Sequence, residues 1–161
     1  MYDYNKIVED LLKWYDAHAR DLPWRREPKP YYVWVSEIML QQTRVEAVKG
    51  YFTRFIEALP NIEALANAPE EQLLKLWEGL GYYNRVRNLQ KAAITVMEEF
   101  HGELPADYKE LLTLKGIGTY TAGAIASIAY GIQVPAVDVN VLRVMKRLAG
   151  SYDDIMKASF K

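Results

Sequence analysis

Two acidic side chains, Glu37 and Asp138, occupy positions from which a carboxyl group can do chemistry. Glu37 shares a helical stripe with Trp34, Ile38 and Gln41, at spacings of three and four residues. The apolar members of this stripe would desolvate the Glu37 carboxyl and favour its protonated form. A surface glutamate beside an apolar stripe is the alternative interpretation of this segment.

Asp138 directly precedes a helical pattern, which places it at the N-cap position of a helix. Backbone N–H groups and the helix dipole would hold its carboxylate ionised there. On this segment alone, a plain helix cap with no further function is the better explanation. One carboxyl held protonated and another held ionised is the usual division of labour in glycosidic bond cleavage, so the pair predicts that chemistry.

A third candidate is the Gly-x-Gly sequence Gly116-Ile117-Gly118 between two predicted helices. Glycines permit positive φ and let another backbone approach closely, because they have no side chain. Exposed amides at the start of the following helix suit a phosphate group. An ordinary turn between helices is the alternative, but the flanking pattern Leu-x-Gly-Ile-Gly-x-x-Thr-Ala resembles the helix–hairpin–helix DNA-binding motif.

The elements that position these residues are helices, since apolar residues recur at helical spacing and strand-like alternation is nearly absent. We therefore expect an all-α fold of short helices joined by short turns. The helical pattern is interrupted at residues 22–24. The helix that starts at residue 69 ends at Gly79 or Gly81. The expected helices cover residues 7–15, 31–42, 45–59, 69–79, 83–100, 107–112, 119–130 and 138–149. One domain is expected over residues 1–150, and the start of a further, truncated helix over 151–161.

The composition narrows the classes of function. The chain has 161 residues, one domain's worth, and no cysteine, which excludes disulfides, thiolate zinc sites and cysteine-ligated iron–sulfur clusters within it. No apolar run approaches the ~18 residues that a membrane helix needs, and the first residues do not resemble a signal peptide. We expect a cytoplasmic protein that contacts no membrane and holds no metal site of its own.

Charge alone leaves the partner open. Twenty basic and 21 acidic residues give a net charge of −1, so a nucleic-acid binder of this composition must concentrate its positive charge on one face. Solvated helix faces are an equally good interpretation of the basic clusters. These clusters are Arg20, Arg25 and Arg26; Arg85, Arg87 and Lys91; and Arg143, Lys146 and Arg147.

Four segments occur in order and at matching distances: RDLPWR at 20–25, SEIMLQQT at 36–43, GLGYY at 79–83, and the hairpin followed by Asp138. Together they resemble the N-terminal catalytic domain of the adenine DNA glycosylase family, from the first helix to about Ala149. The resemblance implies a helix–hairpin–helix DNA glycosylase fold, a six-helix barrel module plus an N-terminal helix. It implies base excision repair of double-stranded DNA, by hydrolysis of the N-glycosidic bond of adenine mispaired with 8-oxoguanine or guanine.

The resemblance also implies roles for single residues. Glu37 would protonate adenine N7 and help activate a water, and Asp138, with Asn140 nearby, would stabilise the oxocarbenium-like sugar. Tyr120 would sit against these groups, at the position where bifunctional relatives carry a nucleophilic lysine. The base pocket would be lined by Arg20, Trp24, Arg25, Leu40 and Val45. The DNA contacts would come from Gln41, Gln42, Thr43, Leu80, Tyr82, Gly116, Ile117 and Gly118, with Gln42 entering the base stack.

Several of these roles have structural alternatives. Trp24, Leu40, Val45 and Leu80 would also fit a hydrophobic core, Arg25 would fit a surface ion pair, and Gln42 would fit a plain helix end.

Members of the family usually continue into a four-cysteine 4Fe-4S segment and a C-terminal domain that helps recognise 8-oxoguanine. Neither lies within these 161 residues, so no cofactor is expected in this chain, with a monovalent cation on the hairpin carbonyls as the one candidate ligand. A monomer is expected. The alternatives are a thymine-mismatch glycosylase of the same superfamily and a non-catalytic helix–hairpin–helix DNA-binding module. Gln41-Gln42 favours adenine, because the thymine branch tends to carry basic residues there.

Overall fold

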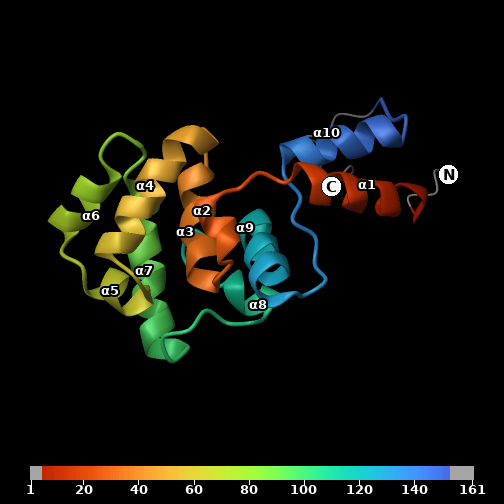
Figure 1. Ribbon diagram of the computed structural model, residues 1–161. Coiled ribbons are helices and arrows are strands. Elements are labelled where there is room, and N and C mark those ends of the chain that lie inside the picture. The colour runs from red at the N-terminus through yellow and green to blue at the C-terminus, as the bar shows by residue number, and fades with distance from the viewer. Residues whose placement is uncertain (1–4, 153–161) are drawn as a thin grey trace. The chain divides into compact units, whose positions relative to one another are not determined.

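The computed structural model describes residues 5–152, and this part of the chain is all-α, with no strand (Figure 1). The expectation of an all-α fold is therefore confirmed. The chain divides into two compact units, one of residues 22–136 and one formed by the two terminal segments. The truncated helix expected over 151–161 lies almost wholly outside the described residues, and the two that are described, Ser151 and Tyr152, are not helical.

The first unit is built around α3 (Pro30–Leu40), seven of whose 11 residues are buried. Pro30 stands at the start of the helix, where its missing N–H costs nothing. The run that follows is apolar on nearly every side, which is the pattern of a helix enclosed by others. The helices α2 (Pro23–Arg26), α4 (Val45–Ala58), α7 (Asn84–Glu99) and α9 (Thr119–Ala124) all pack against it.

Aromatic side chains fill the space between α3 and its neighbours. Trp24 of α2 lies edge-on to Phe52 of α4, with ring centroids 5.4 Å apart. Phe55 of α4 meets Trp77 of α6 (Glu70–Trp77) in the same way at 5.9 Å. Edge-to-face pairs of this kind add to the free energy gained from burying the rings.

The helix α5 (Ile62–Asn67) and α7 make the most extensive helix pair of this unit. Asn61 caps α5, because its side-chain oxygen accepts a hydrogen bond from the amide of Ala64 at 2.8 Å. Gln90 of α7 then donates to the carbonyl of Ala68 at 2.7 Å, just past the end of α5. Sequence periodicity predicted neither α5 nor α2. Both helices are too short to repeat an apolar period, and Pro23 starts α2 where we expected only a break.

The hairpin region follows as α8 (Tyr108–Leu111), α9, and a π-helical turn, η1 (Ile125–Ala129). The single helix expected over 119–130 is therefore divided by a change of helix type. Gly123 allows the next loop to cross close to α9, since a Cβ there would lie 2.2 Å from the carbonyl oxygen of Pro135.

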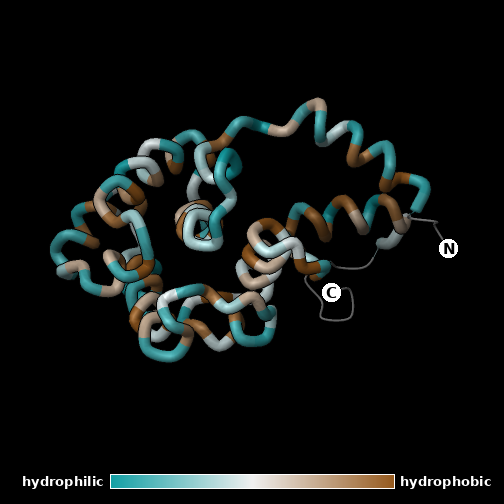
Figure 2. Tube along the Cα trace, turned by 60° about the horizontal axis from the view of Figure 1, so that its bottom comes forward, coloured by the Kyte–Doolittle hydropathy of each residue, from teal (hydrophilic) through white to brown (hydrophobic). Residues whose placement is uncertain are grey.

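The second unit holds α1 (Asn5–His18) and α10 (Val139–Leu148). Figure 2 shows hydrophobic and hydrophilic residues alternating along both helices. Several large apolar side chains of α1 are more than half exposed, among them Leu11, Leu12 and Trp14. None of the described residues of α1 is buried.

Candidate active site and DNA interface

Glu37 lies in the third turn of α3, between two buried residues, Ser36 and Ile38, and is itself half-buried. Its helix packs against α9 and η1, and Tyr120 stands in the first turn of α9, 36% exposed. The structure thus brings the helix of the predicted acid and the helix of its predicted neighbour together. The burial agrees with a carboxyl that is partly shielded from water.

Asp138 is the N-cap of α10, as the sequence predicted, and both of its carboxylate oxygens accept hydrogen bonds. The amide of Val141 donates to Oδ1 at 2.8 Å, and the side-chain amide of Asn140 donates to Oδ2 at 3.0 Å. Arg143 in turn donates to the Asn140 oxygen at 3.2 Å. Asn140 is therefore placed beside Asp138, as expected, and the network fixes the carboxylate in one orientation. This group belongs to the terminal unit and Glu37 to the other.

The two glycines of the hairpin differ in backbone conformation. Gly116 has φ +79, which is the left-handed conformation that favours glycine. Gly118 has φ −93 and ψ −176, extended backbone that any residue adopts, and nothing lies within 4 Å of a Cβ built there. Gly116 therefore uses the positive φ that glycine permits, and Gly118 does not. The fold itself does not require a glycine at 118, so the missing side chain leaves room for an approaching molecule.

Ile117, predicted with these glycines as a DNA contact, is 6% exposed and packs into the core. Its side chain anchors the hairpin, so any contact made at this residue must use its backbone. Leu80 is 7% exposed and Trp24 is 5% exposed, and the core alternative therefore describes their side chains. Leu40 and Val45 are half-buried, while Arg20 and Arg25 are exposed.

Gln42, predicted to enter the base stack, and Tyr82, predicted as a further DNA contact, lie on two exposed turns. Gln42 follows the C-cap residue of α3 and has φ +60, and Tyr82 precedes the N-cap residue of α7 and has φ +49. Both residues thus have the left-handed conformation, which is uncommon for residues other than glycine. Tyr82 is 68% exposed, and Gln41 and Gln42 are exposed as well. Thr43 closes the first turn with a weak hydrogen bond from its hydroxyl to the carbonyl of Gln41, at 3.4 Å.

One side chain that the sequence did not single out, that of Arg85, connects these two turns. Arg85 was counted among basic surface clusters, but its guanidinium reaches inward and donates to five backbone carbonyls. Burial lowers the pKa of this guanidinium, and the nearby Tyr82 opposes that effect. No spacing rule distinguishes Arg85 from Arg87, two residues later, which is exposed and pairs with Glu70 at 2.7 Å.

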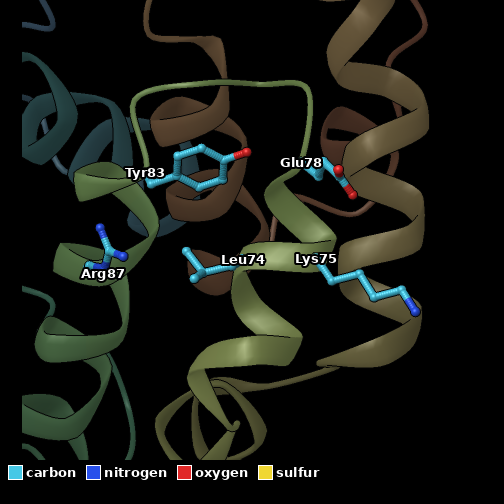
Figure 3. A pocket seen from close by; sticks show the side chains of 5 residues that line it. All are labelled: Leu74, Lys75, Glu78, Tyr83 and Arg87. Atoms are coloured by element: carbon cyan, nitrogen blue, oxygen red, sulfur yellow. The ribbon is translucent and has the colours of Figure 1, made fainter.

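A surface cavity of about 320 Å³ lies beside the turn that carries Tyr82, between α6 and α7. Figure 3 shows the Tyr83 ring pointing from the start of α7 toward α6, and Leu74 pointing back toward α7. Lys75 points away from this opening (Figure 3). Within residues 5–152 there is no group of three or more side chains able to hold a metal ion, and no helix long and apolar enough to cross a membrane.

Comparison with known proteins adds the evolutionary relationship. A family model described as "HhH-GPD superfamily base excision DNA repair protein" matches residues 35–159. The adenine DNA glycosylase of Mus musculus is 46% identical over 155 residues, which cover 91% of this chain and 30% of that protein. This chain thus spans less than a third of the length of that relative.

Two solved structures are similar over most of the chain. A thermostable thymine-DNA glycosylase has a TM-score of 0.83 and 29% identity, and the match covers 88% of this chain and 66% of that one. A non-covalent endonuclease III–DNA complex has a TM-score of 0.79 and 26% identity, covering 97% and 74%. The expected helix–hairpin–helix glycosylase fold is confirmed by these matches.

Proposed function

This chain belongs to the HhH-GPD superfamily of base excision DNA repair proteins, and we propose that it removes adenine mispaired with 8-oxoguanine or guanine from double-stranded DNA. The observation that carries the proposal is that a single buried helix, α3, holds Glu37 and ends at the exposed Gln41-Gln42 turn. The helix would then hold Gln42, which enters the base stack, at a fixed distance from Glu37, the acid that protonates the extruded base.

The reaction is hydrolysis in which the C1′–N9 bond of the nucleotide breaks. Glu37 delivers its proton to adenine N7, so the base leaves with the bonding electron pair as a neutral molecule. Water then adds to C1′ and gives a proton back to the Glu37 carboxylate. Asp138, held by Val141 and Asn140, opposes the positive charge that develops on the sugar.

The partner is the DNA duplex, held at the hairpin by the backbone amides around Gly118 and with a monovalent cation on the hairpin carbonyls. Since the chain has no cysteine, a 4Fe-4S cluster would need ligands from outside these 161 residues. We infer a monomer that works on chromosomal DNA in the cytoplasm of a bacterial-type cell.

A thymine-mismatch glycosylase is the second candidate, because a thymine-DNA glycosylase structure matches at 29% identity. Adenine is favoured by the higher identity, 46%, to an adenine DNA glycosylase and by the two glutamines at 41 and 42. A non-catalytic DNA-binding module is the third.

Incubation with A:8-oxoguanine, A:G, T:G and fully paired duplexes, followed by alkali, separates these three. We expect alkali-dependent breaks at adenine in the first two duplexes. Breaks at thymine in the T:G duplex would support the second candidate, and binding without breaks in any duplex would support the third.

A further inference from the structure

Arg85, in the first turn of α7, connects two segments that are far apart in sequence. Its Nη1 donates to the carbonyls of Ile38 at 2.9 Å, Met39 at 3.3 Å and Gln41 at 2.5 Å. Its Nη2 donates to the carbonyls of Leu80 at 3.1 Å and Gly81 at 3.2 Å. One side chain therefore holds both the end of α3 and the turn that leads into α7.

The end of α3 needs such a partner. The last carbonyls of a helix accept no hydrogen bond from within the helix, and the left-handed position after the C-cap of α3 holds Gln42, not the usual glycine. A cation at this end also interacts favourably with the helix dipole. Lysine would supply the charge, but only arginine presents a planar fork of donors that can serve two groups of carbonyls at once.

Aromatic rings complete the surroundings of this guanidinium. Its carbon lies 5.4 Å from the ring centre of Trp77 and 5.7 Å from that of Tyr82. The indole N–H of Trp77 donates to the carbonyl of Gly81 at 3.1 Å, the same oxygen that accepts from Arg85. Trp77 is fully buried, so Arg85 and Trp77 together attach the Gly81-Tyr82 turn to the core.

The two turns that Arg85 joins are the ones that carry left-handed residues, Gln42 and Tyr82. Among residues 5–152, His101 is the other residue besides glycine with positive φ. Such conformations persist where the surrounding structure over-determines them, and they cluster at functional sites. Hydrogen bonds from Arg85 to the carbonyl just before Gln42 and to the carbonyl just before Tyr82 provide this constraint.

We propose that Arg85 is a positioning residue of the DNA interface, which braces the Gln41-Gln42 turn against the Tyr82 turn so that both meet the base stack as one preformed unit. Arg85 acts through these turns and touches no reacting atom. The proposal rests on the proposed function in one respect, that the two turns contact DNA. Bracing two contact residues before binding reduces the entropy that would be lost on ordering them in the complex.

The first test needs no DNA. We expect Arg85→Lys to raise amide hydrogen exchange about 10- to 100-fold at Thr43 and Leu80, the range expected for losing charge-assisted hydrogen bonds. Amides of α4 and α5 should exchange as before. Arg87→Lys is the matched control, because it makes the same substitution at an exposed position of the same helix. Unchanged exchange in either turn would overturn the proposal, and so would a uniform rise over the whole chain, which would give Arg85 a role in folding alone.

The second test measures binding to an A:8-oxoguanine duplex and to a fully paired duplex of the same length. Arg85→Lys should weaken mismatch binding about tenfold and leave binding to paired DNA unchanged, whereas loss of a phosphate contact would weaken both alike. If Arg85 acts through Gln42, the double variant with Gln42→Ala should lose less than the two single effects combined. Additive losses would overturn the mechanism.

The two tests separate the proposals. If the wild-type chain does not distinguish the two duplexes, the proposed function is wrong. In that case, loosening of both turns in Arg85→Lys would still establish the brace, and its absence would reject it.

Discussion

Gln42 and Tyr82 combine exposure with a backbone conformation that is uncommon for their residue types. Each stands on a turn whose preceding carbonyl is held by Arg85. Because both side chains are exposed, burying them does not require this backbone conformation. At the residue scale, the conformation is therefore best explained by a requirement for where these side chains point.

We expect Gln42→Ala to weaken binding to a mismatched duplex about tenfold, equivalent to ~1.4 kcal/mol. Extruding a base costs a few kcal/mol, and a side chain that fills the gap offsets part of this cost. Binding to fully paired DNA should change little. Fluorescence anisotropy with both duplexes measures the difference, and equal losses on the two would contradict a role in the base stack.

Tyr120 determines a second residue-scale prediction, that the product strand stays intact until alkali is added. A tyrosine cannot form an imine with the sugar, which is how a lysine nucleophile leads to strand cleavage. Borohydride should therefore trap little covalent complex. Efficient cleavage without alkali, together with a strong trapped adduct, would show that a lysine of this chain acts as nucleophile.

Single residues differ in how well the sequence predicts them. Asp138 was predicted as an N-cap, because capping depends on local chemistry that a short segment contains. Arg85 could not be predicted, because its five acceptors are backbone carbonyls, 4 to 47 residues away, that carry no sequence signal. The catalytic, base-pocket and DNA-contact roles expected of the site residues all stay predictions.

At the scale of elements, the hairpin contains one glycine that its backbone favours, Gly116, and one that the fold could replace, Gly118. A valine at Gly118 would find extended backbone and open space, and the loss of an N-cap glycine costs at most about 1 kcal/mol. Its side chain would nevertheless stand among the amides that we expect to face phosphate.

Gly118→Val should therefore weaken binding to mismatched and paired duplexes alike, with a salt dependence reduced by roughly one phosphate contact. Titrations at several salt concentrations measure both quantities. Ala106→Val, at an exposed position outside the hairpin, is the control and should bind normally. A loss confined to the mismatched duplex would instead place the hairpin in base recognition.

A side chain at Gly123 should destabilise the fold, in contrast to one at Gly118. A Cβ at this position of α9 would lie 2.2 Å from the Pro135 oxygen, so the loop that crosses α9 must shift. Gly123→Ala should destabilise the chain by about 1–3 kcal/mol, seen as a lower melting temperature. Gly50→Ala is the control in α4, where a Cβ meets Arg54 at 3.7 Å and helix propensity predicts a small gain. Equal melting temperatures for the two variants would contradict the crowding at α9.

Helical periodicity predicted the long elements well. The helix expected over 45–59 is observed as Val45–Ala58, and that over 83–100 as Asn84–Glu99, because each spans several turns of a one-sided apolar pattern. The shorter α5 and the π-helical η1 were missed. The first has too few residues for a pattern, and the second depends on packing that no local spacing encodes.

For the molecule as a whole, a net charge of −1 means that attraction to DNA must come from local arrangement. Two of the basic side chains are already engaged within the protein, because Arg85 donates to backbone carbonyls and Arg87 pairs with Glu70. Fewer positive charges are therefore left to attract DNA. The amides of the hairpin and the two braced turns gain importance accordingly. The Asp138 network completes the set of groups that the proposed reaction uses.

Adenine excision is tested most directly by the amount of free adenine released from an A:8-oxoguanine duplex in a single turnover, with the chain in excess. The wild-type chain should release adenine in step with alkali-labile sites. Glu37→Gln should bind the duplex normally but release adenine about 10²- to 10⁴-fold more slowly, the usual loss for a missing general acid. Absence of adenine release by the wild-type chain would contradict the proposed function, and equal rates for the two proteins would contradict the role of Glu37 as the acid.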